Sequence, residues 1–151
     1  ITDSTADFSP FSAAVASTAM STFEVINYTS FGYVVQIAGS TLANGGNTID
    51  AMSATGPSQV GTEQFGINLV ANTSPVSLGA NPNNGQFGFG QAATNYNTAN
   101  NYRFVSGETI ATAPKSSGKT IYTISYIVNV AALTQGGQYT ANQTLVVTGT
   151  Y

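Results

Sequence analysis

The segment Ser116-Ser-Gly-Lys119 matches S-x-x-K, a catalytic motif in which a lysine three residues on activates a serine nucleophile. That chemistry needs a helix to hold both side chains on one face. Gly118 weakens any helix here, Lys119 opens an alternating β pattern, and the companion triplets S-D-N and K-T-G are absent. We therefore expect a hairpin turn at this position.

Carboxylates are the other candidates for chemistry, and the chain has six of them: Asp3, Asp7, Glu24, Asp50, Glu63 and Glu108. None lies in a D-x-D-x-D loop or in an aspartic-protease D-T/S-G triplet. Their scatter along the chain suits solvated positions near strand ends rather than a glycosidase pair. Metal binding through Asp3 and Asp7 stays a minor alternative.

An isopeptide crosslink between Lys119 and Asn142, assisted by Glu63, would need apolar surroundings. The polar neighbours of the lysines do not provide them.

Several reactive residue types are missing altogether. The chain contains no histidine, cysteine or tryptophan, and only 6% of its residues are charged. Histidine is the side chain whose unperturbed pKa lies nearest neutral pH, and cysteine supplies thiolate nucleophiles, disulfides and zinc ligands. We therefore predict that the protein is not an enzyme and uses no metal or other cofactor.

The charge content favours an exported protein, since typical globular domains carry about 25% charged residues. The three cations, Arg103, Lys115 and Lys119, form no basic run, so neither nucleic acid nor an anionic membrane surface is expected as a partner. No apolar run approaches the roughly 18–20 residues that span a bilayer. The first residue, Ile1, fits a removed signal peptide. These features predict a secreted, cell-surface protein that does not insert into the membrane.

The C-terminal third alternates with the period of a β-strand. Alternate positions are aromatic or β-branched over residues 119–130, and the alternation resumes over residues 138–151. Residues 134–137, which include a Gly-Gly pair, separate the two runs. We predict that the two runs form an antiparallel hairpin.

Further strands are expected upstream, and no convincing helix of normal length is found. Asn44-Gly-Gly-Asn47 is a turn signal between runs at 40–43 and 48–52. Eight or nine short strands with Gly, Asn and Pro between them predict an all-β fold, either a β-sandwich or a barrel. We expect an antiparallel β-sandwich, Ig-like or pilin-like, as one domain over residues 21–151. The other predicted runs are 21–27, 31–38, 63–71, 102–106 and 108–113.

Residues 79–101 form a long connection rich in Asn, Gly and Phe. Loops of this length without regular structure often bind ligands. Phe87, Phe89, Tyr96 and, just beyond the loop, Tyr102 are the candidate recognition residues. Alternatively, Phe87 and Phe89 fold the loop back onto the end of the sandwich.

Residues 1–20 form an apolar N-terminal arm with few turn signals after Pro10. In an isolated domain this arm would be an ordinary first strand. It is also suited to leaving its own domain and pairing with the sheet of a neighbouring subunit. The residues expected to anchor it are Phe8, Phe11, Ala13, Val15 and Ala19.

Three stretches carry a resemblance to known proteins: GTEQFGINLVANTSP (61–75), YRFVSGETIA (102–111) and TIYTISYIVNV…GGQYTANQTLVVTGTY (120–151). They resemble uncharacterised secreted surface proteins of ultrasmall episymbiotic bacteria, over about residues 23–151. The closing strand is also loosely similar to pilus and spore-coat-type β-sandwich subunits. In several such families an N-terminal extension of one subunit completes the sandwich of the next.

Two functions are compatible with these observations. The first is a structural subunit of an extracellular filament, pilus or surface layer, a homopolymer joined by strand exchange through the arm. The alternative is a monomeric adhesion module that binds a surface glycan or host protein through residues 79–101. The absence of tryptophan weakens the glycan hypothesis, because sugar-binding sites rely on exposed aromatic rings.

Overall fold

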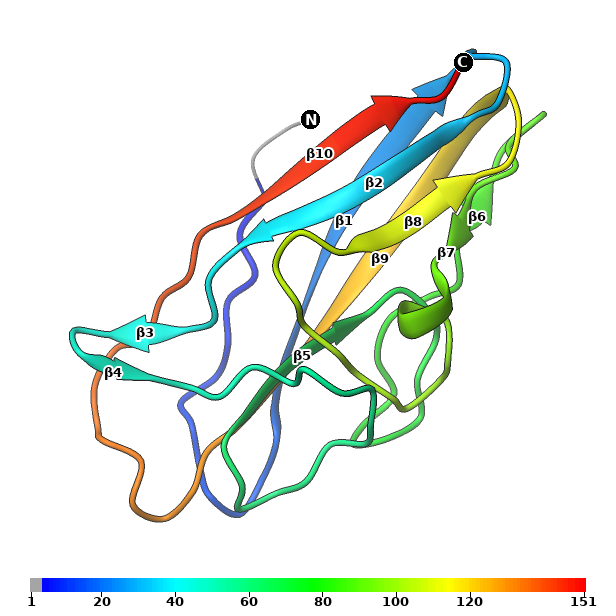
Figure 1. Cartoon of the computed structure of the whole chain (residues 1–151). Coiled ribbons are helices and arrows are strands. Elements are labelled where there is room, and N and C mark those ends of the chain that lie inside the picture. Colours follow the sequence, from blue (N-terminus) through cyan, green and yellow to red (C-terminus); the bar gives the residue numbers. More distant parts are fainter. Residues whose placement is uncertain (1–3) are drawn as a thin grey trace.

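The computed structural model describes residues 4–151, and these fold as a β-sandwich (Figure 1). Its ten strands confirm the predicted all-β class and come close to the predicted count. They are β1 (Ser17–Asn27), β2 (Tyr33–Gly39), β3 (Ala43–Asn44), β4 (Asn47–Thr48), β5 (Gln64–Asn68), β6 (Asn83–Asn84), β7 (Gln91–Ala92), β8 (Thr109–Ala113), β9 (Ser117–Asn129) and β10 (Gln143–Gly149).

The first sheet is built around β9. This strand pairs antiparallel with β1 on one side and with β5 and β6 on the other. Its alternating side chains, among them Tyr122, Ile124 and Val128, enter the core between the sheets. Ile127 points to the opposite face and is also buried, because it packs with Met52, Leu78 and Tyr102 from the connecting segments.

The second sheet has the order β10-β2-β8-β7, and all its pairings are antiparallel. Tyr33, Val35 and Ile37 of β2 face the core, as their alternation predicts. The Tyr33 and Tyr122 hydroxyls lie 2.8 Å apart and join the two sheets through the core. Phe23 stacks on Tyr122 with ring centroids 4.8 Å apart.

The predicted C-terminal hairpin is wrong, because β9 and β10 belong to opposite sheets. Both edges of β9 are already occupied, by β1 on one side and by β5 and β6 on the other. β10 therefore pairs with β2, and residues 130–142 cross between the sheets. The connection at residues 114–116 also crosses between sheets, from β8 to β9, so the hairpin turn expected there is wrong as well.

Other local predictions have mixed outcomes. The Asn44-Gly-Gly-Asn47 turn is confirmed, because it joins β3 to β4. The run at 102–106 forms only isolated bridges, from Tyr102 to Gly56 and from Arg103 to Ile67. The one helical element in residues 4–151 is a 3-10 turn, η1 (Thr94–Tyr96). No helix in this part of the chain is long and apolar enough to cross a bilayer.

The two long sides of the sandwich are closed differently. On one side, residues 79–101 carry β6 onto β9 and β7 onto β8, so this segment ties the two sheets together. On the other side, the sheets end in β1 and β10 (Figure 1). The N-terminal arm lies on this second side, and the candidate site is there.

Candidate assembly groove

The edges of β1 and β10 border the groove between the sheets. Within residues 4–151, β1 pairs only with β9 and β10 only with β2, so each strand keeps one edge without a strand partner. An edge of this kind presents unpaired backbone N–H and C=O groups, which readily accept another strand. The groove therefore has the backbone chemistry that strand addition requires.

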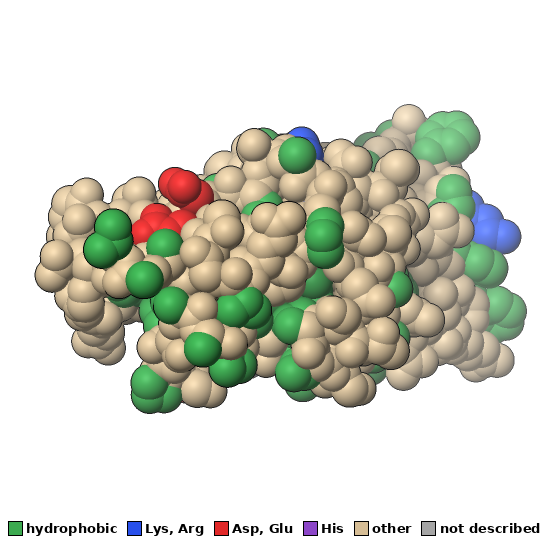
Figure 2. All heavy atoms as spheres, turned by 90° about the horizontal axis from the view of Figure 1, so that it is seen from below, with side chains coloured by type: hydrophobic (Ala, Val, Ile, Leu, Met, Phe, Trp, Pro, Cys, Tyr) green, Lys and Arg blue, Asp and Glu red, His purple; other side chains and the backbone are tan. Residues whose placement is uncertain are grey.

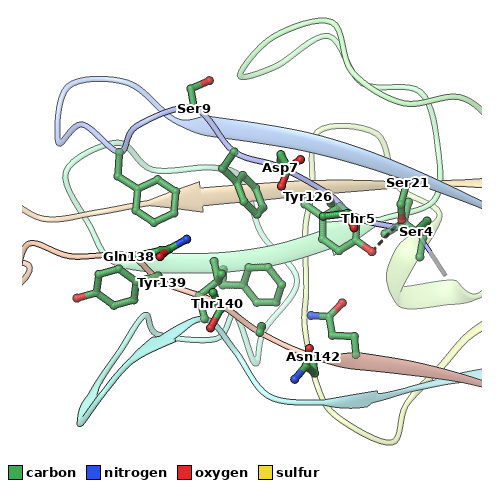
Figure 3. A pocket seen from close by; sticks show the side chains of 18 of the residues that line it. Ser4, Thr5, Asp7, Ser9, Ser21, Tyr126, Gln138, Tyr139, Thr140 and Asn142 are labelled. Carbon is green, nitrogen blue, oxygen red and sulfur yellow. Dashed lines mark hydrogen bonds between the residues drawn. The ribbon is translucent and has the colours of Figure 1, made fainter.

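The N-terminal arm lies in this groove without becoming a strand. Its one backbone bridge is local, between Ser12 and Val15. Aromatic contacts hold it instead: Phe8 packs edge-on against Tyr126 with ring centroids 6.4 Å apart, and Phe11 lies 6.1 Å from Tyr139 (Figure 3). Residues 4–16 of the arm are thus attached by side chains, and their backbone hydrogen-bonding capacity is not used in pairing with either sheet.

A cavity of about 830 Å³ lies between the arm, β1 and the segment that leads into β10. The buried side chains of Phe65 and Ile124 line it on the inside. Gln138, Thr140 and Asn142, which are exposed, line it on the outside (Figure 3). Among the residues of 4–151 that line it, Asp7 alone is charged. This mostly uncharged lining suits apolar side chains and backbone rather than a charged substrate.

Tyr126 is the titratable group at the centre of the groove. Its hydroxyl lies 3.0 Å from Ser21 Oγ, and either oxygen can donate. Burial raises the pKa of the Tyr126 phenol, while the bond to Ser21 partly opposes this shift. The phenol is therefore neutral at physiological pH and acts as a packing and hydrogen-bonding group.

The predicted arm residues are only partly where the sequence places them. Phe8, Phe11 and Ala13 pack half-buried against the core, whereas Val15 is exposed. Ala19 is not in the arm, because it lies within β1 and pairs with Tyr126. The arm therefore ends at residue 16 rather than 20. The first three residues of the predicted arm lie outside the described part of the chain.

The predicted binding loop is corrected in two positions. Tyr96 and Tyr102 are completely buried, so neither ring is available to a ligand at the surface. Phe87 is exposed at the tip of the loop and has a φ of 58°. Phe89 is half-buried, and the Lys115 Nζ lies 3.8 Å from its ring centroid.

Tyr96 belongs to a polar cluster that anchors the loop, which sequence reasoning missed. Its hydroxyl donates to Glu108 Oε2 over 2.7 Å, and Arg103 donates to both oxygens of the same carboxylate. The Arg103 guanidinium holds the pKa of Glu108 below its usual value. Burial, together with the Glu108 carboxylate, raises the pKa of Tyr96. The available signal was two opposite charges five positions apart in a chain with few charges.

A second anchor that sequence reasoning missed consists of buried amides. Asn68 and Asn72 exchange side-chain hydrogen bonds of 2.6 and 2.9 Å, and Asn72 Oδ1 also accepts from the Asn100 backbone N–H. The Asn68 amide donates to the Asn101 carbonyl as well. These bonds fix the end of the 79–101 segment against β5. A chain rich in Asn offers no signal that separates such buried amides from exposed ones.

The minor chemical alternatives are not assembled in the structure. Lys119 Nζ pairs with Glu24 at 2.7 Å on the surface, while Glu63 accepts a hydrogen bond from Thr134. Lys119 and Glu63 lie near opposite ends of β9, so the isopeptide parts are far apart. Within residues 4–151 no three His, Cys, Asp or Glu side chains group as metal ligands, and Asp3 lies outside that range.

Comparisons with protein-family models, curated proteins and solved structures gave no match to this chain. The resemblance to bacterial surface proteins therefore remains an expectation from the sequence. The function must be inferred from the groove, the arm and the surfaces around them.

Proposed function

We propose that this chain is a non-catalytic structural subunit of an extracellular filament or surface layer. Subunits join when the N-terminal arm of one occupies the groove between β1 and β10 of the next. The observation that carries the proposal is the arm itself, whose described part, residues 4–16, lies beside two open strand edges and pairs with neither. Export is supported by the low charge content of the chain.

The energetics favour an arm that can exchange. Its own groove provides aromatic packing for Phe8 and Phe11. A neighbour's groove can provide aromatic packing together with strand pairing, in which each net hydrogen bond contributes about 0.5–1.5 kcal/mol. The tethered arm competes from an effective concentration in the millimolar range, so exchange requires concentrated subunits or further contacts between them.

Removing the two aromatic anchors tests the proposal in the full chain. The double variant Phe8→Ser with Phe11→Ser should lose filaments in electron micrographs and sediment as a monomer. The ten strands should remain, because β1 begins only at Ser17. Ser9→Ala, at an exposed arm position, is the matched control and should assemble normally. Unchanged filaments from the double variant would show that the arm is not the connector.

Exchange can also be trapped covalently, because the natural chain has no cysteine. A Phe8→Cys chain is mixed with a differently tagged Tyr126→Cys chain under oxidising conditions. Exchange of the arm predicts a disulfide between the two tags, because the side chains at these positions are in contact. The pair Phe8→Cys with Val76→Cys measures the disulfide yield from random collision. Equal yields from both mixtures would contradict exchange.

Adhesion through the 79–101 loop is the second candidate, and exposed Phe87 is the observation that favours it. The buried positions of Tyr96 and Tyr102 leave only two of its four aromatics near the surface. A Phe87→Ala variant should lose binding to a glycan array or host cells if this function is correct, at an unchanged melting temperature. Unchanged binding would remove the loop as the ligand site.

A further inference from the structure

Four segments far apart in the sequence meet at the end of the sandwich where β1 and β10 finish (Figure 1). The Phe31 backbone N–H donates to the Thr150 carbonyl over 3.1 Å, and the Gly118 N–H donates to the Phe87 carbonyl over 2.7 Å. Gly32 packs against the backbone of Ala113 and Lys115. We call this end the tip; its segments are residues 28–32, 85–88, 114–116 and 149–151.

The tip holds every aromatic side chain that is exposed in residues 4–151. Tyr28, Phe31, Phe87 and Tyr151 are between 65% and 91% exposed. All other Phe and Tyr side chains of the chain are buried or half-buried. Exposed apolar groups gathered in one place, rather than scattered singly, are typical of a protein interaction surface.

The one charged side chain in the four tip segments is that of Lys115. Lys115 is exposed, and within the described residues it forms no ion pair. Lys119, at the nearby start of β9, is neutralised by Glu24. The four tip segments contain no Asp or Glu. A partner that fits the tip therefore presents apolar side chains together with carboxylates.

The opposite end of the sandwich has that composition. It lies at the far end of β9, whose 13 residues span about 40 Å. There, exposed aliphatic side chains accompany two carboxylates that form no ion pair within residues 4–151 (Figure 2). We call this end the base; its residues are Val15, Asp50, Val60, Glu63 and Leu133.

We infer that the tip of one subunit docks on the base of a second copy of this chain. The inference deepens the proposed function and rests on it, because it names the surfaces through which neighbouring subunits meet. Aromatic rings at the tip pack on Val60 and Leu133 of the base, and Lys115 faces Asp50 and Glu63. A contact between two different surfaces does not close on itself, so repeating it gives an open chain of subunits.

The position of the arm supports this end-to-end arrangement. The arm joins the sandwich at the base, where Val15 bridges to Ser12 and the Ala13 carbonyl lies near Gly61. In a stacked pair, the base of one subunit brings its arm to the tip of the next. The tip is the end at which β1 and β10 both finish, so the arm reaches the edges that it pairs with in the proposed exchange.

A second copy accounts for both ends, whereas a glycan accounts only for the aromatic rings. A neutral sugar gives no role to the carboxylates at the base, which form no ion pair within residues 4–151. The same chain carries both complementary surfaces, about one strand length apart. Weak docking of this kind also supplies the additional contact that lets an arm leave its own groove.

Substitutions at the two ends of the full chain test the inference. Phe31→Ser at the tip and Leu133→Ser at the base should each raise the concentration needed for assembly by about tenfold or more, as expected for interface hot spots. Both side chains are exposed, so the melting temperatures should not change. Val76→Ser removes an exposed apolar group that belongs to neither end, and it should assemble like the natural chain.

Charge reversal gives a sharper version of the same test. Lys115→Glu should weaken assembly, because it places like charges opposite each other. The double variant Lys115→Glu with Asp50→Lys should recover most of it, since the pair is restored in reverse. Sedimentation velocity across a concentration series measures the assembly of both variants. Failure of the second substitution to restore assembly would overturn the pairing of these two ends.

The outcomes separate this inference from the proposed function. Normal assembly of the Phe31→Ser, Leu133→Ser and Lys115→Glu variants overturns the end contact, while loss of filaments in the Phe8→Ser, Phe11→Ser variant still supports the arm. If the Phe31→Ser, Leu133→Ser and Lys115→Glu variants fail to assemble while the Phe8→Ser, Phe11→Ser variant forms normal filaments, the end contact is supported and the arm is not the connector. Loss of glycan binding by Phe31→Ser with unchanged assembly assigns the tip to adhesion, and the inference fails.

Discussion

Arg103 and Glu108 show how a chain with so few charges uses them. Their ion pair is only partly exposed, and the Tyr96 hydroxyl completes it. The other pair, Lys119 with Glu24, lies at the surface, where ion pairs contribute little. The two pairs therefore differ in energy although each joins one cation to one carboxylate.

Glu108→Gln should lower the free energy of unfolding by about 1 kcal/mol, a figure already reduced for partial solvent screening. The substitution leaves Arg103 without its counter-charge and weakens the bond from Tyr96. Urea unfolding followed by tyrosine fluorescence measures the change. Glu24→Gln is the matched control and should unfold close to the natural chain. Equal losses in both variants would show that burial of the Arg103 pair is irrelevant.

The folded protein should lose stability in acid, because Glu108 becomes protonated there. The pKa of Glu108 is lower in the folded protein than its ordinary value, so folding favours the charged form. The stabilisation is complete above the unfolded pKa of about 4.3, and it is lost as the pH falls through the folded pKa. Urea midpoints between pH 7 and pH 2 should therefore converge for the natural chain and Glu108→Gln. A constant difference across this range would contradict the assignment.

At the scale of elements, β9 organises the molecule. It pairs with three strands and is buried on both faces. The 79–101 segment depends on it, because β6 pairs with β9 and Gly90 lies against Thr120 and Tyr122. This packing turns a long connection into the wall that closes one side of the sandwich.

Gly90→Ala should destabilise the protein by about 1–3 kcal/mol, the usual cost of overpacking. A Cβ at this position would come within 2.2 Å of the Tyr122 hydroxyl oxygen and 2.5 Å of Thr120 Cγ2. Gly46→Ala is the matched control, because nothing lies within 4 Å of its Cβ position. Differential scanning calorimetry compares the two. If both melt alike, the segment is not packed on β9 as described.

At the scale of the whole molecule, the charges are few and separated, with Lys115 at the tip and Asp50 and Glu63 at the base. In the proposed end contact, the apolar groups at the two ends then supply most of the docking energy. Charges direct the encounter and set the orientation of the subunits. The elongated sandwich thus carries charges of opposite sign at its two ends, although its net charge is small.

Salt should separate these two contributions to assembly. The Debye length falls from about 10 Å at 0.1 M to 3 Å at 1 M, so added salt screens exposed charges and leaves apolar packing intact. Raising the salt should therefore partly restore assembly of Lys115→Glu, but not of Phe31→Ser. Light scattering at both salt concentrations measures this. Equal recovery of both variants would mean that salt promotes association regardless of the charge at position 115, and it would contradict the assigned role of Lys115.

The sequence was sufficient for properties that depend on residue type and local order. Missing His and Cys, low charge and alternation along β2 and β9 indicated an all-β sandwich without obvious catalytic groups. Alternation shows which side chains share a face, because neighbouring side chains of a strand point to opposite sides. The Asn-Gly-Gly-Asn turn was recognisable for the same local reason.

Strand partners, burial and the two ends were decided only in three dimensions. Every strand offers the same backbone donors and acceptors, so the sequence of β10 contains nothing that favours β2 over β9. Tyr96 and Tyr102 resemble surface aromatics until distant residues cover them, and Tyr28, Phe31, Phe87 and Tyr151 become one surface only where four distant segments meet. Long-range packing, which no local pattern encodes, brings these residues together.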